Sequence, residues 1–474
     1  MAATSPYLRH YGDAHYGWIA MALAMLALAL GSGYTLALGE MAGMYVALSL
    51  VGAVAVLFDF RTGAVLLALL LPLSTSALFP HGLLGITGLN PLNLLLLATL
   101  GSYVIHGRSE AAGPLVGKPL AWLYIVPILA AGLIGITHVE DIPPYLIELV
   151  GFYTERSYLL TVVIKPFVIV AVALIIGAAA AKSHKPERFI IAIALSAWVM
   201  ALIQIGFVIF QGVPLLALTG ARSFYEPLGT HANSLGRLHL FALALLLFVW
   251  ADTKRPAMRL FLLLTVAVLG LALLLTFSRA AIGTAALVGA LFLIWKFNAK
   301  ALALALIAVT LVVLLAGDIL YFRATWGLDE GANAVSAGRI DNIWLPLLPE
   351  LAKTPPWGNG LNSITWSFAM VNEAMRPVTH PHNAYLEALL DMGIIGLALL
   401  LAYYAHVWKG FRALSSNLSL SPDMRSLFQG ATAALLAFLV TCLVGSSLRP
   451  EPESAYLWIA IGLMYGLRGR RPAS

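Results

Sequence analysis

The segment THPHNAYLEALLDMG carries two histidines, His380 and His382, between a long polar stretch and an apolar run. Histidine changes its charge near neutral pH, so His382, followed by Asn383, could act as a general base toward a hydroxyl group. The helix that begins here would turn Tyr385 inward. The HPH spacing also resembles part of a metal site, but no Cys helps and no third ligand is obvious. A helix-capping or interfacial histidine is the alternative.

Two arginines are expected where helices begin. Arg279 follows Ser278 at the junction of two apolar runs, in LLLTFSRAAIGTAALV. A serine cap and the positive end of the helix would join the guanidinium in binding phosphate, whereas an interfacial anchor is the alternative role. Arg339 lies in SAGRIDNIW, on the first turn of a predicted helix, where it could instead form a salt bridge to Asp341 or Glu350.

Three further polar side chains could contact a substrate. Lys165 lies in TVVIKPFVIV, about 10 Å inside a predicted span at ~1.5 Å per residue. A cation at that depth needs a partner, water or a bound anion, unless it snorkels back to the interface. Arg222 precedes two aromatic residues in GARSFYEPLGTHANSLGRLHL, an arrangement common in sites that hold sugar or phosphate. Asn233, in the same loop, either caps the next helix or contacts the substrate.

The composition of the chain points to a membrane protein. Of its 474 residues, 61% are hydrophobic and 11% are charged, whereas a soluble domain carries roughly 25% charged residues. This excludes a soluble enzyme, a disordered protein and a nucleic-acid binder. The single cysteine, Cys442, permits no intramolecular disulfide and no thiolate metal cluster. There is no Gly-rich phosphate loop, so no nucleotide cofactor is expected.

Fourteen apolar stretches are candidate membrane spans, each of which needs ~20 residues. Several are short, so twelve spans remain an alternative. The stretch after Arg9 exceeds a signal-peptide core and lacks a small-residue cleavage pattern, so it is expected to be a membrane anchor. The candidates are 16–37, 41–58, 62–79, 89–106, 118–137, 158–180, 188–212, 234–251, 258–277, 280–297, 300–321, 383–406, 425–446 and 453–467.

Basic residues orient these spans. With both termini in the cytoplasm, all but ten of the 28 Lys and Arg residues fall on the cytoplasmic side, as the positive-inside rule requires. The outer segments 138–157, 213–233 and 322–382 are then long. An anionic ligand at the outer face would explain the ten exceptions, and Arg156 is expected to contact it. The ten are Arg156, Lys165, Arg222, Arg237, Arg279, Arg323, Arg339, Lys353, Arg376 and Arg449.

Several short segments together resemble the bacterial O-antigen ligase and O-antigen polymerase superfamily. PHNAYLEALLDMGIIGL resembles its H-N-x-x-L signature, and SAGRIDNIW and PPWGNGLNSI resemble its S-x-G-R…W and G-x-G segments. TFSRAAIG and THANSLGRL resemble its S-R helix start and its N-x-L/G segment. The resemblance covers roughly residues 220–400. The family's motif histidine corresponds to His382, and its motif arginines correspond to Arg279 and Arg339.

The expected fold is an all-α polytopic integral membrane protein, a bundle of about 12–14 transmembrane helices with one large periplasmic loop that contains short helices. Residues 1–137 would form N-terminal transmembrane helices, and residues 138–321 central ones with periplasmic loops 138–157 and 213–233. Residues 322–382 would form the large periplasmic loop. Residues 383–474 would form C-terminal transmembrane helices and a cytoplasmic tail.

The resemblance implies a glycosyltransferase of the bacterial inner membrane that acts at the periplasmic face. It would move a glycan from undecaprenyl pyrophosphate to the lipid A–core oligosaccharide, with inversion at the anomeric carbon. His382 would be the general base. Arg222, Arg279 and Arg339, with Lys165, would hold the pyrophosphate in place of a metal, and Asn383, Tyr385, Asn233 and Arg156 are expected to contact the substrates.

Membrane lipid is the other expected partner, and no binding of nucleic acid is expected. The chain is expected to be a monomer that needs no cofactor. Two alternatives stay open. One is a polymerase that transfers the glycan, an O-antigen or an exopolysaccharide, to another lipid-linked repeat. The other is a transporter of lipid-linked sugars, which Lys165 and the Pro-broken spans would suit, although no internal repeat is seen.

Overall fold

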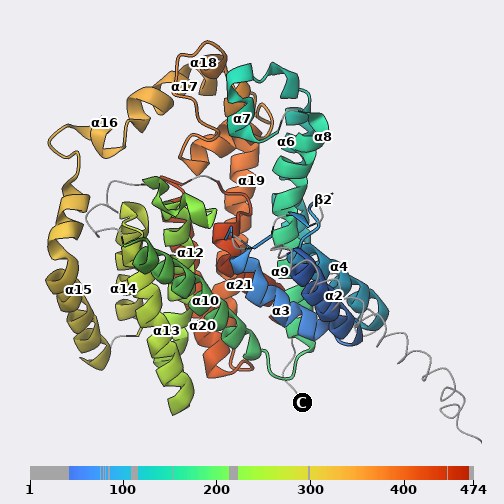
Figure 1. Ribbon diagram of the computed structural model, residues 1–474, viewed down its shortest axis with the longest axis vertical. Helices are drawn as coiled ribbons and strands as arrows, with labels where there is room; N and C mark the ends of the chain where they lie inside the picture. Colours follow the sequence, from blue (N-terminus) through green and yellow to red (C-terminus); the bar gives the residue numbers. More distant parts are fainter. Residues whose placement is uncertain are drawn as a thin grey trace, which may run out of the picture. The chain divides into compact units, whose positions relative to one another are not determined.

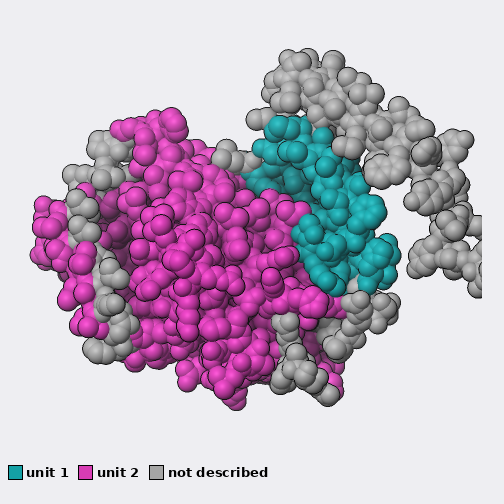
Figure 2. All heavy atoms as spheres, turned by 90° about the horizontal axis from the view of Figure 1, so that it is seen from below, with its two compact units in different colours: residues 1–63, 77–110 teal, residues 64–76, 111–474 magenta. Residues whose placement is uncertain are grey.

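The computed structural model describes residues 42–74, 76–77, 79–80, 82–83, 86–107, 116–152, 154–212, 222–296, 299–445 and 447–468. The candidate span 16–37 lies outside these residues. The chain divides into two compact units, Met1–Gly63 with Ala77–Glu110 and Ala64–Ser76 with Ala111–Ser474 (Figure 2).

The first unit is small and mainly helical. Its helix α2 packs against α4, and its two short strands pair in an antiparallel hairpin. Helix α3 begins in this unit and continues into the second. These elements are α2 (Ala42–Phe58), α3 (Phe60–Leu73), β1 (Gly82–Leu83), β2 (Ile86–Thr87), α4 (Pro91–Ser102) and the π-helical turn η2 (Tyr103–Gly107).

The second unit is a bundle of long helices with short helices at one end (Figure 1). Its first half contains α5 (Lys118–Leu120), η4 (Ala121–Ile125), α6 (Val126–Ile136), η5 (Val139–Asp141), η6 (Pro144–Leu146), α7 (Ile147–Val150), α8 (Glu155–Tyr158), η7 (Leu159–Ile164), α9 (Lys165–Lys182), α10 (Arg188–Gln211), η8 (Arg222–Leu228), α12 (Ala232–Asp252) and α13 (Pro256–Leu275). Its second half contains α14 (Arg279–Trp295), α15 (Ala299–Thr325), α16 (Ala332–Val335), η9 (Ile340–Trp344), α17 (Leu345–Leu351), η10 (Ser363–Trp366), α18 (Phe368–Val371), α19 (Ala384–Ser415), α20 (Pro422–Thr441), η11 (Pro452–Ser454) and α21 (Ala455–Leu467).

The helices confirm the expectation of an all-α polytopic membrane protein. Among the described residues, seven helical segments are long and apolar enough to cross a membrane by length and composition, and four shorter apolar helices accompany them. Each candidate span from 41–58 to 453–467 contains helix among its described residues, although α3 ends at Leu73, inside the candidate 62–79. The long loop expected at 322–382 starts slightly later, because α15 continues to Thr325, and it contains the short helices α16, η9, α17, η10 and α18.

Small residues let the helices of the second unit approach closely. Helices α9 and α21 meet through Gly177, Gly462 and Gly466, where a Cβ atom on any of the three would overlap the backbone of the facing helix. Such contacts between small residues are typical of helix pairs in membranes, where dispersion forces between closely packed backbones replace the hydrophobic effect.

Helix α19 is broken at Gly393, whose φ of 65° and ψ of −173° are not helical. The segment that follows α17 enters this break. The N–H groups of residues 359 and 360 donate hydrogen bonds to the carbonyl oxygens of residues 390 and 391, at 2.9 and 3.0 Å. Gly358 and Gly360 also have positive φ, and a Cβ atom on either would overlap neighbouring backbone. The first two turns of α19 are therefore fixed in place by the polar loop before them.

Candidate functional site

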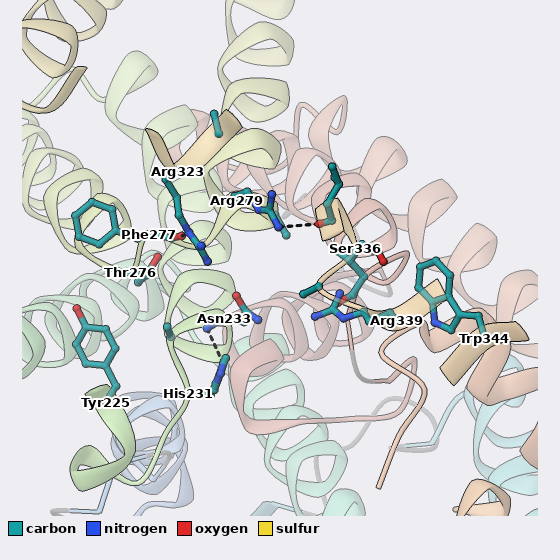
Figure 3. A pocket seen from close by; sticks show the side chains of 16 residues that line it. Tyr225, His231, Asn233, Thr276, Phe277, Arg279, Arg323, Ser336, Arg339 and Trp344 are labelled. Carbon is teal, nitrogen blue, oxygen red and sulfur yellow. Dashed lines mark hydrogen bonds between the residues drawn. The ribbon is translucent and has the colours of Figure 1, made fainter. Parts of the chain in front are cut away.

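The ends of several long helices surround a cavity of about 380 Å³, which we call the first cavity (Figure 3). Three guanidinium groups line it, from Arg279, Arg323 and Arg339, together with the aromatic rings of Tyr225 and Trp344. No Asp or Glu is among the described residues that line it. A cationic cavity of this kind favours an anionic ligand, because guanidinium groups keep their charge and bind phosphate with two parallel hydrogen bonds.

Arg279 is the first residue of α14, as the sequence predicts. The Ser278 side chain caps this helix by accepting a hydrogen bond from the N–H of Ala281, and its hydroxyl donates to Asn233 Oδ1 at 2.8 Å. The guanidinium donates to the carbonyl oxygens of Trp326 and Val335, at 3.1 and 2.8 Å. These bonds connect the Arg279 side chain to the beginning of the long loop that follows α15, and the side chain starts at the positive end of its own helix.

Arg323 reaches the same cavity from the last turn of α15. Its Nε donates to the carbonyl oxygen of Phe277 at 3.2 Å, and its guanidinium lies 6.0 Å from the centre of the Trp326 ring. Phe277 precedes the cap of α14 and has a positive φ of 48°. The turn between α13 and α14 is thus tied to the end of α15, which brings Arg323 to the cavity that Arg279 also lines.

Arg339 follows Gly338, whose φ is 78°, and directly precedes the π-helix η9 without a capping bond from its side chain. Its Nη1 donates to the carbonyl oxygen of Val444 at 3.5 Å. Of the two carboxylates considered as its partners, Glu350 accepts a hydrogen bond from the N–H of Phe368 at 2.9 Å. Arg339 lines both the first cavity and the neighbouring one.

The neighbouring cavity, which we call the second cavity, has a volume of about 250 Å³. It shares His231, Asn233, Ala337 and Arg339 with the first cavity, so the two are contiguous. Its own lining residues are Gly338, Ile343, Arg376, Pro377, Val378 and His382. No carboxylate is among its described lining residues either. The structure therefore brings His382 beside two arginines in one continuous cationic space.

His231 and Asn233 position the start of α12 at both cavities. The ring nitrogen Nδ1 of His231 accepts a hydrogen bond from the N–H of Asn233 at 3.1 Å, so His231, rather than Asn233, caps this helix. Asn233 instead accepts a hydrogen bond from Ser278. This bond joins the starts of α12 and α14, and Asn233 lines both cavities.

His382 lies in a tight turn directly before α19. Its φ of 55° is in the left-handed region, which residues other than glycine seldom adopt and which is common at functional sites. Asn383 caps α19 by accepting hydrogen bonds from the N–H groups of Tyr385 and Leu386, each at 3.1 Å. The ring centres of His380 and His382 are 4.2 Å apart, at an interplanar angle of 70°.

His380 is held neutral at physiological pH. Burial lowers its pKa, and the positive charges of Arg237, Arg339 and Arg449 lower it further, while Glu453 opposes them, with a result of about 4. A neutral imidazole has one donor and one acceptor nitrogen, so His380 can hydrogen-bond without adding charge next to His382.

A buried polar network holds the loop of residues 359–363 against the start of α19. Arg449 donates to Glu387 at 2.8 Å and to Asn362 Oδ1 at 3.0 Å. Asp391 accepts hydrogen bonds from the N–H groups of Asn362 and Ser363, at 3.0 and 2.9 Å. Each charge in this network has a partner, and removal of one partner would leave the other charge buried and uncompensated.

Four residues expected to contact substrate do not line either cavity. Asn383 caps α19, and the Tyr385 hydroxyl donates to the carbonyl oxygen of Leu439 at 2.7 Å. Arg156 and Lys165 are exposed, on α8 and at the start of α9. The side chain of the remaining expected contact, Arg222, lies outside the described part of the structure.

The position of Lys165 has a physical reason. It follows the π-helix η7, and Pro166 occupies the start of the next helix. The wider π-helical turns shift the faces of the helix relative to a regular α-helix, so the direction of Lys165 could not be derived from the sequence periodicity.

Arg323 and Arg376 were not singled out from the sequence. Both belong to the ten basic residues that violate the positive-inside bias, and both line a cavity. That bias was the signal that could have found them. Among the described residues, no group of three His, Cys, Asp or Glu side chains is placed to hold a metal ion.

The far ends of the same helices carry the basic residues assigned to the cytoplasm. Lys254 and Arg255 follow α12, Lys296 follows α14, and Arg412 lies in the last turn of α19. Lys296 pairs with Asp252 at 2.5 Å. The two cavities and this basic surface thus lie at opposite ends of the long helices.

This fold and site define a multi-pass membrane protein whose helix ends enclose an arginine-lined space beside a histidine. Residues 264–401, which include Arg279, Arg323, Arg339, Arg376 and His382, match the family model described as O-antigen ligase. The chain is 28% identical over 261 residues to an O-antigen ligase of Pseudomonas aeruginosa, a match that covers 53% of this chain and 57% of that protein. Both comparisons thus find similarity to O-antigen ligases, and the family match includes residues that line the two cavities, which agrees with the resemblance seen in the sequence motifs.

Proposed function

We propose that this protein is an O-antigen ligase that transfers a glycan from undecaprenyl pyrophosphate to the lipid A–core oligosaccharide at the periplasmic face of the bacterial inner membrane. The observation that carries the proposal is the continuous cationic space. Four arginines and His382 line the two joined cavities, and no carboxylate is among their described lining residues. A pyrophosphate fits such a space because its charge needs several fixed cations.

In this proposal the first cavity holds the pyrophosphate. Arg279, Arg323 and Arg339 would bind its oxygens and stabilise the charge that develops as it leaves. Two of these side chains are already anchored by backbone carbonyl groups, Arg279 at Trp326 and Val335 and Arg323 at Phe277. Anchored donors need little reorganisation when the charge appears. The protein's own cations would thus do the work that a metal ion does in other glycosyltransferases.

The second cavity would hold the acceptor. The hydroxyl oxygen of the acceptor forms a bond to the anomeric carbon of the donor sugar. The bond from that carbon to the pyrophosphate oxygen breaks. The hydroxyl proton passes to the imidazole of His382, and the electron pair leaves with the pyrophosphate. Direct displacement inverts the anomeric carbon. Arg339 lines both cavities, so it is placed to contact the leaving group beside the base.

The periplasmic assignment rests on charge. The cavities lie at the helix ends opposite those that carry Lys254, Arg255, Lys296 and Arg412. Because Lys and Arg near the ends of spans remain in the cytoplasm, the cavities would open on the other side.

The test is transfer by the purified protein from a lipid-linked glycan to lipid A–core. A ligase attaches the glycan to lipid A–core, which slows its migration on a gel. A polymerase lengthens the lipid-linked glycan whether or not lipid A–core is present, and a transporter leaves the glycan on its carrier. Either of these results would contradict the ligase assignment.

A further inference from the structure

The second cavity has a cation that the proposed chemistry does not use. Arg376 lines it together with His382, and the two residues belong to one short segment. The backbone of Arg376 is fixed, since its N–H donates to the carbonyl oxygen of Asn342 at 3.0 Å and the preceding Met375 is buried. The side chain is exposed at the cavity. A guanidinium on a fixed backbone beside the base can therefore contact a ligand.

The charged side chains around Arg376 that line the second cavity are all basic among the described residues. The second cavity contains two guanidinium groups, from Arg339 and Arg376, and no Asp or Glu among its described lining residues. Neutral sugar hydroxyls are bound equally well by acceptor and donor groups, so a site for a neutral glycan needs no excess of cations. Since Arg339 also faces the proposed pyrophosphate site, Arg376 is the positive charge that remains without a carboxylate among the described lining residues, and it favours a ligand that is itself an anion.

The arginines also differ in how they are held. Arg279 and Arg323 are anchored to backbone carbonyl groups around the first cavity. No side-chain hydrogen bond or ion pair is found for Arg376 in the described part of the chain, and its segment continues through Pro377 and Val378 to His380 and His382. A group bound by Arg376 would thus lie close to the base rather than at the leaving pyrophosphate.

We infer that the second cavity selects an acidic acceptor, a sugar that carries a phosphate or carboxylate group near the accepting hydroxyl, and that Arg376 recognises this group. The inference rests on the proposed transfer function and names the chemistry of its acceptor. Arg376 is a specificity-determining residue in this view, because it orients the hydroxyl toward His382 through the anion and takes no part in the bond changes.

The test compares acceptors in transfer assays with the purified full-length protein. The acceptors are untreated lipid A–core, lipid A–core stripped of its phosphates, and lipid A–core whose carboxyl groups have been reduced to alcohols. The wild-type protein should show a KM at least about tenfold higher for one of the treated acceptors, as the loss of a charge-assisted hydrogen bond predicts. The arm that loses affinity identifies the anion as phosphate or carboxylate.

Arg376→Gln should raise the KM for the untreated acceptor by about the same factor and remove the preference, while the KM for the donor stays unchanged. Arg376→Lys should restore part of the preference, because it keeps the charge. Lys353→Gln is the matched control, since it removes an exposed cation from the same loop but none of the described cavity lining. It should behave as the wild type.

Equal use of all three acceptors by the wild type would overturn this inference and leave the transfer function standing. A preference that persists in Arg376→Gln would overturn the role of Arg376. Transfer to none of the acceptors would contradict the proposed function, and the inference would fall with it.

Discussion

The indole N–H of Trp344 donates a hydrogen bond to the carbonyl oxygen of Pro381 at 2.8 Å. Pro381 lies between His380 and His382, and Trp344 is the last residue of the π-helix η9, which begins directly after Arg339. This hydrogen bond therefore connects η9, which follows Arg339, to the turn that contains His382, the proposed base. Since His382 has a left-handed backbone conformation, the turn needs such external support.

Replacing Trp344 by Phe should keep most of the aromatic packing and remove this hydrogen bond. We expect kcat to fall up to about tenfold, because a single hydrogen bond contributes ~1 kcal/mol and its loss lets the turn move. The KM for the donor should change little. Steady-state kinetics on the purified variant measures both values. An unchanged kcat would show that the turn is held by other contacts.

Replacing Arg323 by Gln should weaken binding of the lipid-linked donor by about tenfold or more, because a charge-assisted hydrogen bond to phosphate is lost. Arg279→Lys should also weaken it, since an ammonium cannot reproduce the bonds that the guanidinium makes to Trp326 and Val335. Binding can be measured with labelled donor in detergent. If both variants bind the donor like the wild type, the first cavity is not the pyrophosphate site.

Transfer should survive chelation of divalent ions. The proposed site stabilises the leaving group with guanidinium groups, and the described residues offer no cluster of three metal-ligating side chains. The measurement is the transfer rate before and after treatment with EDTA. A complete loss that added divalent ions restore would instead assign His380 and His382 to a metal site.

Acid should destabilise the protein through His380. Its pKa is about 4 in the folded chain and ~6.5 in an unfolded one, so the unfolded state binds more protons between these values. The stability that His380 contributes is therefore present above about pH 6.5 and is lost as the pH falls toward about 4. Melting temperatures in detergent at pH 7.5 and 5 should fall less for His380→Gln than for the wild type. An equal fall would mean that His380 is not kept neutral by its surroundings.

The positions of the helices could be predicted from the sequence because long apolar stretches alone determine them. The break in α19 could not, because Gly393 lies inside an apolar run that reads as one span. The break depends on the loop containing Gly358 and Gly360, which enters the helix from more than thirty residues away. The π-helix before Lys165 could not be predicted either, because the pattern of apolar residues does not reveal one extra residue in a helical turn.

The arginines of the site were partly foreseeable. Arg279 and Arg339 stand out through helix-start patterns, and the positive-inside bias also marks Arg323 and Arg376. Asn383 and Tyr385 lie within three residues of His382 in the sequence, but the Asn383 side chain caps the helix and the Tyr385 hydroxyl reaches α20, because residues at a helix start point in different directions. A basic residue that violates the positive-inside rule therefore indicates the cavity lining better than closeness to His382 in the sequence does.

The central claim is that His382 removes the acceptor proton in a space where arginines hold the pyrophosphate. The most direct test measures donor binding and transfer to lipid A–core for purified, stable His382→Ala beside the wild type. We expect the donor affinity to be unchanged and the transfer rate to fall by at least about 100-fold, as the loss of a general base predicts. Transfer at the wild-type rate by the folded variant would contradict the account.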